Sequence, residues 1–365
     1  MTLRDINVLN QKSKVPKISV KVVEEPPYVV DRSKLRRFTQ KNIIFERVIW
    51  DSSWKGYKKN YDEKVLDIIA QGKSGYSQVD FALAYASWIV HDAFKDGFSW
   101  TKIRTYKTPV DTIGIDWAKT KREINDLHKM NIYIKRAAKL FGASLVGICN
   151  LNRNWVYADV DIPKKFENVI VMAVEMDADG IATSPAVSAA AATGAGYSKM
   201  SFIAACMGEF IRNLGYKAIQ CGNDTALSVP LAIDAGLGEL GRNGLLITPQ
   251  YGPRVRLCKV ITDLPLEADK SIEFGVKEFC KKCKLCAKYC ETGAISMDDE
   301  PSFETACQSN NPGALKWYVN VEQCYLFWYK NGTDCSTCIK VCPYNVASAG
   351  KVNVSPEEFW QSKEH

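Results

Sequence analysis

Two runs of cysteines near the C-terminus constrain the fold of this chain more than any other feature. The first run contains Cys280, Cys283, Cys286 and Cys290, and the second contains Cys324, Cys335, Cys338 and Cys342, with Pro343 directly after it. A C-x2-C-x2-C triplet with a fourth cysteine from a distant run suits four-thiolate ligation of an iron–sulfur cluster. Such clusters transfer electrons, so another part of the chain is expected to receive them.

The spacing distributes the eight cysteines over two cubane clusters. In bacterial two-cluster ferredoxins, each cluster takes three cysteines from one run and its fourth from the other. One [4Fe–4S] cluster is expected at Cys280, Cys283, Cys286 and Cys342, and the other at Cys335, Cys338, Cys290 and Cys324. Ten residues separate Cys324 from Cys335, which leaves a three-iron cluster or ligation by Cys307 open. Zinc sites use two C-x2-C pairs instead.

The composition predicts a globular protein without a membrane span. Hydrophobic residues make up 46% of the chain, which is enough for a large core. The formal charge of +7 falls to about +3 once two oxidised clusters of about −2 each are counted, so no nucleic-acid partner is expected. No apolar run reaches the ~18 residues of a transmembrane helix, and no secretory leader is recognisable. We expect a cytoplasmic protein or the mature form of an exported one.

Four segments differ in character along the chain. Residues 1–128 are aromatic-rich and are expected to wrap the rest, 129–277 form an α/β core, 278–346 form a ferredoxin-like domain, and 347–365 form a tail. Helices are expected at Ile132–Phe141 and Tyr197–Leu214, and strands at Leu145–Cys149, Val169–Met176, Ala218–Cys221, Gly244–Thr248 and Val255–Thr262. Strands that alternate with helices predict a layered α/β (α+β) fold.

Two stretches of small residues are candidates for close approach of the backbone to a large ligand. Gly236, Gly238 and Gly241 match G-x-G-x-x-G, but the preceding Val229–Ala235 resembles a helix rather than the strand that a dinucleotide site requires. Ser184–Tyr197 (SPAVSAAAATGAGY) is rich in alanine and glycine. It fits either a segment that approaches a broad, flat ligand or a tightly packed helix.

Several segments carry a resemblance to a known family. They are Thr193–Met200 (TGAGYSKM), Cys221–Thr225 (CGNDT), Ser228–Thr248, Tyr251–Leu257 (YGPRVRL), Lys259–Leu266 and Phe274–Cys280. Together they resemble respiratory reductive dehalogenases, with the first segment similar to one that contacts a corrinoid. The resemblance covers about residues 130 to 340 and is most specific in 193–290. Epoxyqueuosine reductases share the plan of a corrinoid and two clusters more distantly.

The resemblance implies a cobalamin-type corrinoid in a nitroreductase-like core, supplied with electrons by two [4Fe–4S] clusters. It implies cofactor contacts at Ser184, Thr193, Gly194, Gly196, Gly236, Gly238, Gly241 and Asn243. Corrinoid proteins with a histidine ligand use D-x-H-x-x-G, whereas Asp126–Asn131 (DLHKMN) lacks the glycine. The other histidines are His91 and His365, so a base-off corrinoid is expected.

The same resemblance implies reductive dehalogenation by a Co(I) corrinoid, with halide removed from a small chlorinated hydrocarbon. Tyr197 is the expected proton donor, and Asn223 orients the substrate or the halide. An arginine is expected to stabilise the phenolate, with Arg256 as the first choice and Arg254 as the second. Alternate residues of a strand share a face, so the sequence alone cannot separate the two. Expected residues of the substrate pocket are Phe38, Thr39, Trp54, Trp88, Trp100, Tyr106, Trp317 and Trp328. The ordinary alternatives are that Tyr197 caps a helix and that Arg254 and Arg256 form surface ion pairs.

The expected partners are the halogenated substrate, an external low-potential electron donor and, by family resemblance, a small membrane anchor subunit; a homodimer is a further expectation. The family also implies a location at the outer face of the cytoplasmic membrane, with a cytoplasmic location as the alternative. Two other functions stay open from the sequence. They are epoxyqueuosine reduction on tRNA, and electron transfer or corrinoid carriage without catalysis.

Overall fold

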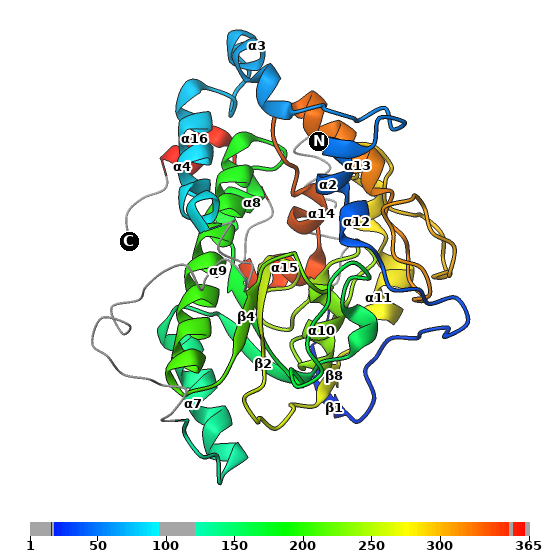
Figure 1. The fold of residues 1–365 in the computed structure, drawn as a ribbon. Helices are drawn as coiled ribbons and strands as arrows, with labels where there is room; N and C mark the ends of the chain where they lie inside the picture. Colours follow the sequence, from blue (N-terminus) through cyan, green and yellow to red (C-terminus); the bar gives the residue numbers. More distant parts are fainter. Residues whose placement is uncertain (1–15, 17, 95–120, 350–352, 362–365) are drawn as a thin grey trace.

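The structure, a computed structural model, describes residues 16, 18–94, 121–349 and 353–361 (Figure 1). The helices are α2 (Ile44–Trp50), α3 (Val65–Ala70), α4 (Gln78–Phe94), α7 (Leu127–Leu140), α8 (Ala178–Ala182), α9 (Val187–Asn213), α10 (Ser228–Asp234), α11 (Val276–Cys283), α12 (Leu285–Lys288), α13 (Val321–Asn331), α14 (Thr337–Lys340), α15 (Pro343–Ala349) and α16 (Pro356–Trp360), with single turns η1 (Gln40–Asn42), η2 (Tyr61–Lys64) and η4 (Arg153–Trp155). The strands are β1 (Lys21–Val23), β2 (Leu145–Asn150), β3 (Asn168–Glu175), β4 (Ala218–Cys221), β5 (Glu239–Leu240), β6 (Leu246–Ile247), β7 (Val255–Thr262) and β8 (Ser271–Glu273).

A four-stranded sheet of order β2-β3-β7-β4 forms the centre of the core, with every neighbouring pair antiparallel. Successive side chains of a strand point to opposite faces. In β3, Ile170, Met172 and Val174 pack with α7 and α9 on one face. Val169 and Val171 pack on the other face, against α10. The predicted strands and the mixed fold class are therefore confirmed, in an antiparallel arrangement.

The alanine- and glycine-rich stretch forms the first half of the long helix α9, beside which α4 runs (Figure 1). Alanine favours helix, and the glycines leave room for neighbouring side chains. A Cβ on Gly194 would collide with Ser87 and Trp88 of α4, and one on Gly196 would meet Arg256. The side of Gly194 and Gly196 to which a Cβ would point is therefore filled by protein, and a cofactor contact of these two glycines stays a prediction. The packed helix, the open alternative, is what the structure shows.

The G-x-G-x-x-G stretch also packs against the protein itself. Gly236 follows α10 with a φ of 72°, and a Cβ there would collide with the carbonyl oxygen of Lys270. A Cβ on Gly238 would collide with the carbonyl oxygen of Ile247, and one on Gly241 with the same residue's side chain. The space beside these three glycines is filled by β6 and by the segment before β8, and their predicted cofactor contacts stay a prediction.

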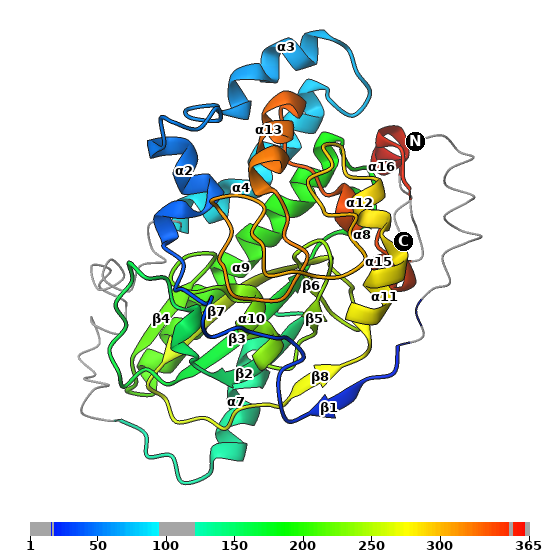
Figure 2. The same ribbon diagram turned by 90° about the vertical axis from the view of Figure 1, so that its right-hand side faces the viewer.

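The N-terminal residues wrap the core, as predicted, and contact the cluster domain. β1 pairs with β8 (Figure 2). α2 packs on α13, where Arg47 forms ion pairs with Asp51 at 2.6 Å and Glu322 at 2.5 Å. The cluster domain contains α11 to α15, and its α14 contacts α8 of the core. Among the described residues, no helix has the length and apolarity to cross a membrane.

Candidate active site

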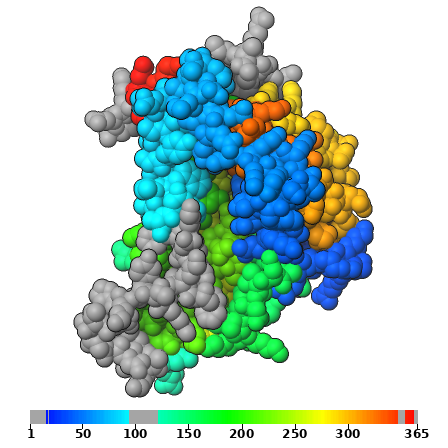
Figure 3. Space-filling view, turned by 45° about the horizontal axis from the view of Figure 1, so that its top comes forward, coloured from blue at the N-terminus to red at the C-terminus, as the bar shows by residue number. Residues whose placement is uncertain are grey.

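Two adjoining cavities lie where the core, the N-terminal segment and the cluster domain meet. Their volumes are about 410 Å³ and 350 Å³. Residues that line both cavities are Ile44, Phe45, Gly244, Ser309, Asn311, Lys316 and Val321. Tyr197 and Arg256 line the larger cavity together with cysteines of the second predicted cluster. Figure 3 shows the surface hollowed between α4 (cyan) and the N-terminal segment (blue), with core residues (green) below.

Tyr197 is the residue on which three elements of the core converge. It extends from α9, and its phenol oxygen accepts a 2.7 Å hydrogen bond from Nδ2 of Asn223, which follows β4. The guanidinium carbon of Arg256, on β7, lies 5.1 Å from the centre of the Tyr197 ring. Trp88 of α4 stacks on the ring at 4.7 Å, and His91 meets it edge-on at 5.2 Å. The structure thus brings three of the four predicted catalytic residues together.

Arg254, the fourth, lies in a different environment, which corrects its assignment as a catalytic candidate. It precedes β7, so it does not share a strand face with Arg256. Its guanidinium is buried and donates to Glu175 at 2.6 Å, to the carbonyl of Met176 and to the side chain of Asn345 at 2.9 Å. Arg254 therefore joins the core to the cluster domain. Arg256 instead donates to Oγ1 of Thr193 at 3.1 Å and lines the cavity.

The loop that carries Asn223 is held by Lys259, which sequence reasoning missed. Lys259 is fully buried in β7, and its ammonium donates to the carbonyls of Gly222 (2.6 Å) and Asp224 (3.1 Å) and to Oγ of Ser228 (3.1 Å). A lysine ammonium has three donors, and here each has a partner. The backbone is thereby fixed on both sides of Asn223. A lysine inside the apolar strand sequence VRLCKVIT was the available signal.

The mutual electrostatic effects of the cluster cysteines agree with the two predicted groups, and their assignment as ligands stays a prediction. Burial raises the pKa of the Cys342 thiol, and the charges of Cys280 and Cys286 raise it further. Burial likewise raises the pKa of Cys324, with further increases from Cys335 and Cys290.

Cys338 interacts with Cys335, Cys324 and Cys290, and also with Cys286 of the other group, so the two groups are neighbours. Cys307 lines neither cavity. Within the described ranges, no three His, Cys, Asp or Glu side chains lie close enough together to hold a single metal ion.

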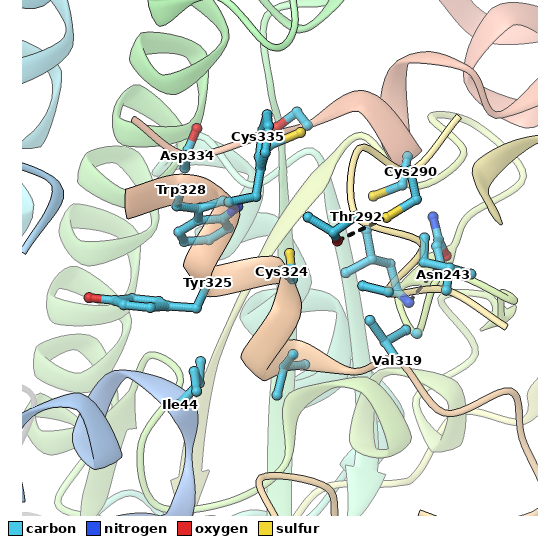
Figure 4. A pocket seen from close by; sticks show the side chains of 18 of the residues that line it. Ile44, Asn243, Cys290, Thr292, Val319, Cys324, Tyr325, Trp328, Asp334 and Cys335 are labelled. Carbon is cyan, nitrogen blue, oxygen red and sulfur yellow. Dashed lines mark hydrogen bonds between the residues drawn. The ribbon is translucent and has the colours of Figure 1, made fainter. Parts of the chain in front are cut away.

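The long gap between Cys324 and Cys335 is explained by α13. This helix carries Cys324, Tyr325 and Trp328 into the wall of the larger cavity, and Figure 4 shows the Cys324 sulfur directed toward the space between Cys290 and Cys335. One element therefore contributes both to the second cysteine group and to the cavity.

The structure places the remaining predicted pocket residues in different surroundings. Trp317 and Trp328 line the larger cavity, and Phe38 lines the smaller one beside Asn223. Trp54 lies behind Tyr325, with ring centres 5.8 Å apart, and Thr39 precedes η1; neither lines either of these two cavities, so their place in a substrate pocket stays a prediction. Trp100 and Tyr106 lie outside the described residues. Sequence reasoning missed Ile44, Phe45, Tyr325, Asp334 and Lys316 as lining residues.

Two residues that line the larger cavity, Arg256 and Asp334, have buried polar atoms without partners. Nε of Arg256 and Oδ1 of Asp334 form no hydrogen bond within the protein. Burial raises the pKa of Asp334 to about 6, although Arg256 and Thr193 oppose the shift. Buried polar groups of proteins almost always have partners. Cavities of this size with unpartnered polar atoms fit a large ligand that carries its own hydrogen-bonding groups, as the amide-fringed corrin ring does.

Of the predicted cofactor contacts, Asn243 lines the larger cavity and Thr193 reaches it through Arg256. Ser184 does not line either cavity. Its hydroxyl accepts from the backbone N–H of Ser336 at 3.0 Å, and its carbonyl accepts from Lys340 at 2.9 Å. Ser184 therefore contacts the loop of the second cysteine group, and its corrinoid contact stays a prediction.

Comparison with known proteins defines the family. Residues 137–266 match the reductive dehalogenase subunit family, and residues 279–346 match the 4Fe-4S dicluster domain. The chain is 32% identical over 374 residues to a tetrachloroethene reductive dehalogenase of Sulfurospirillum multivorans, covering 87% of this chain and 74% of that protein. The chain therefore belongs to the reductive dehalogenases, as the resemblance indicated.

The relatives that the chain matches are longer than the chain itself. A tetrachloroethene reductive dehalogenase of Desulfitobacterium hafniense is 41% identical over 260 residues, which are 58% of this chain and 47% of that protein. The chain thus spans about half the length of this relative. The solved catabolic reductive dehalogenase NpRdhA has the same fold, with a TM-score of 0.69 and 22% identity over 93% of this chain and 47% of that one.

Proposed function

We propose that this protein is a corrinoid-dependent reductive dehalogenase that catalyses R–X + 2 e⁻ + H⁺ → R–H + X⁻ on a small chlorinated hydrocarbon. The observation that carries the proposal is the arrangement of the larger cavity. One wall holds Tyr197 with Asn223 and Arg256 around it, and another holds Cys290, Cys324 and Cys335. A proton donor and the end of an electron path therefore face the same space.

The cavities fit a corrinoid, which when bound supplies the low-valent cobalt that cleaves the carbon–halogen bond. Asn243, Gly244 and Leu245 would hold it on the core side, and Ile44 and Phe45 on the N-terminal side. We expect the base-off form, because the near-miss His128 is exposed on α7 and no described histidine lines either cavity. A solved reductive dehalogenase of this fold is described as B12-dependent.

Tyr197 has the surroundings that a proton donor requires. Proton transfer from its phenol to carbon leaves a phenolate, which the hydrogen bond from Asn223 and the positive charge of Arg256 stabilise. Trp88 covers one face of the ring by stacking on it. These residues position and stabilise the donor without any contribution from Arg254.

The cavity wall also suits a small, uncharged substrate. Phe45, Tyr325 and Trp328 form an aromatic group on α2 and α13, with ring centres 5.7 to 6.3 Å apart. Aromatic walls provide apolar contact area. Relatives named for tetrachloroethene make chlorinated alkenes the first substrates to assay, with chlorinated alkanes beside them.

Electrons would reach the cavity through the two [4Fe–4S] clusters from an external low-potential donor. Because the cysteine group of Cys324 lines the cavity, its cluster would be the inner one, and that of Cys280, Cys283, Cys286 and Cys342 the outer one. A membrane anchor subunit and a location at the outer face of the cytoplasmic membrane belong to the same proposal, by family membership.

An anaerobic reconstitution tests the proposal. The purified chain is loaded with iron, sulfide and a corrinoid, its cobalt and iron contents are measured, and the Co(II) EPR spectrum is recorded. Chlorinated alkenes and alkanes are then assayed with reduced viologen as electron donor. We expect stoichiometric cobalt, about eight irons for two cubanes, a base-off Co(II) spectrum and halide release. A chain that retains no cobalt after reconstitution would contradict the proposal.

A further inference from the structure

Lys316 is a cation in the wall that separates the two cavities. It lines both of them, and its neighbour Trp317 lines only the larger. The backbone of Lys316 is fixed by two hydrogen bonds with Ser302, of 3.0 and 3.1 Å. The position from which its side chain extends is therefore set by the fold.

The ammonium of Lys316 has few partners. Nζ donates to Oδ1 of Asn311 at 3.3 Å and lies 4.6 Å from the centre of the Tyr318 ring. Among the described residues, it has no carboxylate partner. Desolvation lowers the pKa of Lys316 to about 8, so the side chain is mostly cationic at neutral pH. A desolvated ammonium with one neutral oxygen partner is costly unless an anion joins it.

The proposed occupant of these cavities carries such an anion. A corrin ring is fringed with neutral amides, whereas the nucleotide tail of a cobalamin-type corrinoid contains a phosphodiester with a fixed negative charge. We propose that Lys316 binds this phosphodiester at the junction of the two cavities. The inference rests on the proposed function, and it assigns the ring to the larger cavity beside Tyr197 and the tail to the smaller one.

Two alternatives for the anion are less well supported. The substrate is uncharged, so it gives an ammonium nothing to bind. The released halide is an anion, but it forms next to Tyr197, which lines the larger cavity only. A phosphodiester is present throughout the catalytic cycle and compensates the buried charge at every stage. Ammonium–phosphate hydrogen bonds are also of the strong, charge-assisted kind.

Binding of two corrinoids to the cluster-loaded protein tests the inference without any turnover. Cobalamin has the phosphodiester tail, and cobinamide lacks it. The dissociation constants of both are measured by equilibrium dialysis for the unmodified protein, Lys316→Met, Lys316→Arg and Lys34→Met. Lys34 is the matched control, because it also lies over an aromatic ring (Phe303, 4.9 Å) but lines neither cavity.

We expect Lys316→Met to raise the Kd for cobalamin about tenfold, the cost of one charge-assisted hydrogen bond, and to leave the Kd for cobinamide unchanged. Lys316→Arg should keep the preference for cobalamin, and Lys34→Met should change neither constant. The methionine variant should fold with an unchanged or higher Tm, because it removes a desolvated charge. Lys316→Gln serves the same comparison if the methionine variant fails to fold.

An equal change in the Kd values for both corrinoids, or no change in either Kd, would overturn the inference. If the Kd values are unchanged but Lys316→Met abolishes inhibition of turnover by added chloride, the residue binds the halide and the inference is wrong. An unmodified protein that binds neither corrinoid contradicts the proposed function itself, and the inference with it. The cobalamin-to-cobinamide ratio therefore separates the two failures.

Discussion

The amide of Asn223 donates a 2.7 Å hydrogen bond to the phenol oxygen of Tyr197. Tyr197 lines the larger cavity and Asn223 the smaller, so this bond joins the walls of both. It also joins α9 to the loop after β4, two elements that the fold places side by side. A hydrogen bond to this oxygen strengthens when the phenol loses its proton, which is what a proton donor to carbon needs.

Removal of the phenol oxygen tests whether Tyr197 donates the proton. Tyr197→Phe should lower kcat by about 10² to 10⁴, the usual contribution of a general acid, with unchanged cobalt and iron contents. Halide release is measured with reduced viologen. Tyr133→Phe, at an exposed position of α7, is the control and should have full activity. A Tyr197→Phe variant with more than half of the activity would show that another group supplies the proton.

The two neighbouring arginines should respond in opposite ways to the same change. Arg256→Met should lower kcat and leave the Tm nearly unchanged, because the guanidinium faces the cavity and has one partner in Thr193. Arg254→Met removes the hydrogen bonds of a buried guanidinium to Glu175 and Asn345, which should cost about 1.5 to 3 kcal/mol, the value of a hydrogen bond to a charged group. Thermal unfolding and steady-state kinetics of both variants measure the contrast. The reverse pattern would restore Arg254 as the catalytic candidate.

Lys259 should affect the reaction only through Asn223. Lys259→Met releases the carbonyls of Gly222 and Asp224, so kcat should fall about tenfold, the value of one hydrogen bond to a charged group. In an Asn223→Ala background the same substitution should have no further effect on kcat. Thr262→Val removes another buried hydrogen bond of β7, to Lys217, and controls for general destabilisation. An equal loss in both backgrounds would contradict a positioning role.

Trp328 should control substrate choice rather than cluster assembly. It lines the cavity from α13, one turn after Cys324. Trp328→Ala enlarges the cavity, so the ratio of kcat/KM for bulkier over smaller chlorinated substrates should rise, while the iron content stays constant. Trp50→Ala, which changes an exposed side chain on α2, should change neither. Loss of iron in the Trp328 variant would show that the residue is structural.

Asp234 gives the fold a pH-dependent stability. Burial raises its pKa from 3.8 to about 6, although Tyr28 donates a 2.7 Å hydrogen bond to it. A raised carboxyl pKa means that the folded state disfavours the charged form, so the protein loses stability as the pH rises from 4 to 6. Asp234→Asn should be more stable than the unmodified protein at pH 7 and equal to it at pH 4, as measured by urea unfolding.

Asp299, at the protein surface, provides a control for which the pH dependence of stability has the opposite sign. Lys284 lowers the pKa of Asp299, so Asp299→Asn should cost stability at pH 7 and nothing at low pH. A stability difference for Asp234→Asn that does not vary with pH would contradict the raised pKa.

Local patterns made the core strands and the cysteine groups predictable. The strands of the central sheet are short and mostly apolar, and β3 is apolar on both faces because helices cover both. The cysteine spacing is itself a local constraint, since Cys280, Cys283 and Cys286 of one group lie within seven residues, and Cys335 and Cys338 of the other within four. Residues 324 to 335 looked irregular only because α13 intervenes, a helix that continues the cavity wall.

Tertiary contacts decided what the sequence left open. Arg254 and Arg256 are two residues apart, and only the bend before β7 gives them different partners. Gly194 and Gly238 indicated a close approach to the backbone, and the groups that lie close to them are Trp88 and the Ile247 carbonyl. Lys259 and Lys316 could not be found by spacing, because their roles depend on a loop and on cavities assembled from distant segments.

The most direct test of the central claim is the electron balance of dehalogenation by the reconstituted protein. Tetrachloroethene is supplied anaerobically with reduced viologen, and chloride release and viologen oxidation are followed together. The proposal predicts two electrons consumed for each chloride released, with loss of the reaction in the Tyr197→Phe variant. A protein that holds corrinoid and both clusters but releases no chloride from any chlorinated alkene or alkane would contradict it.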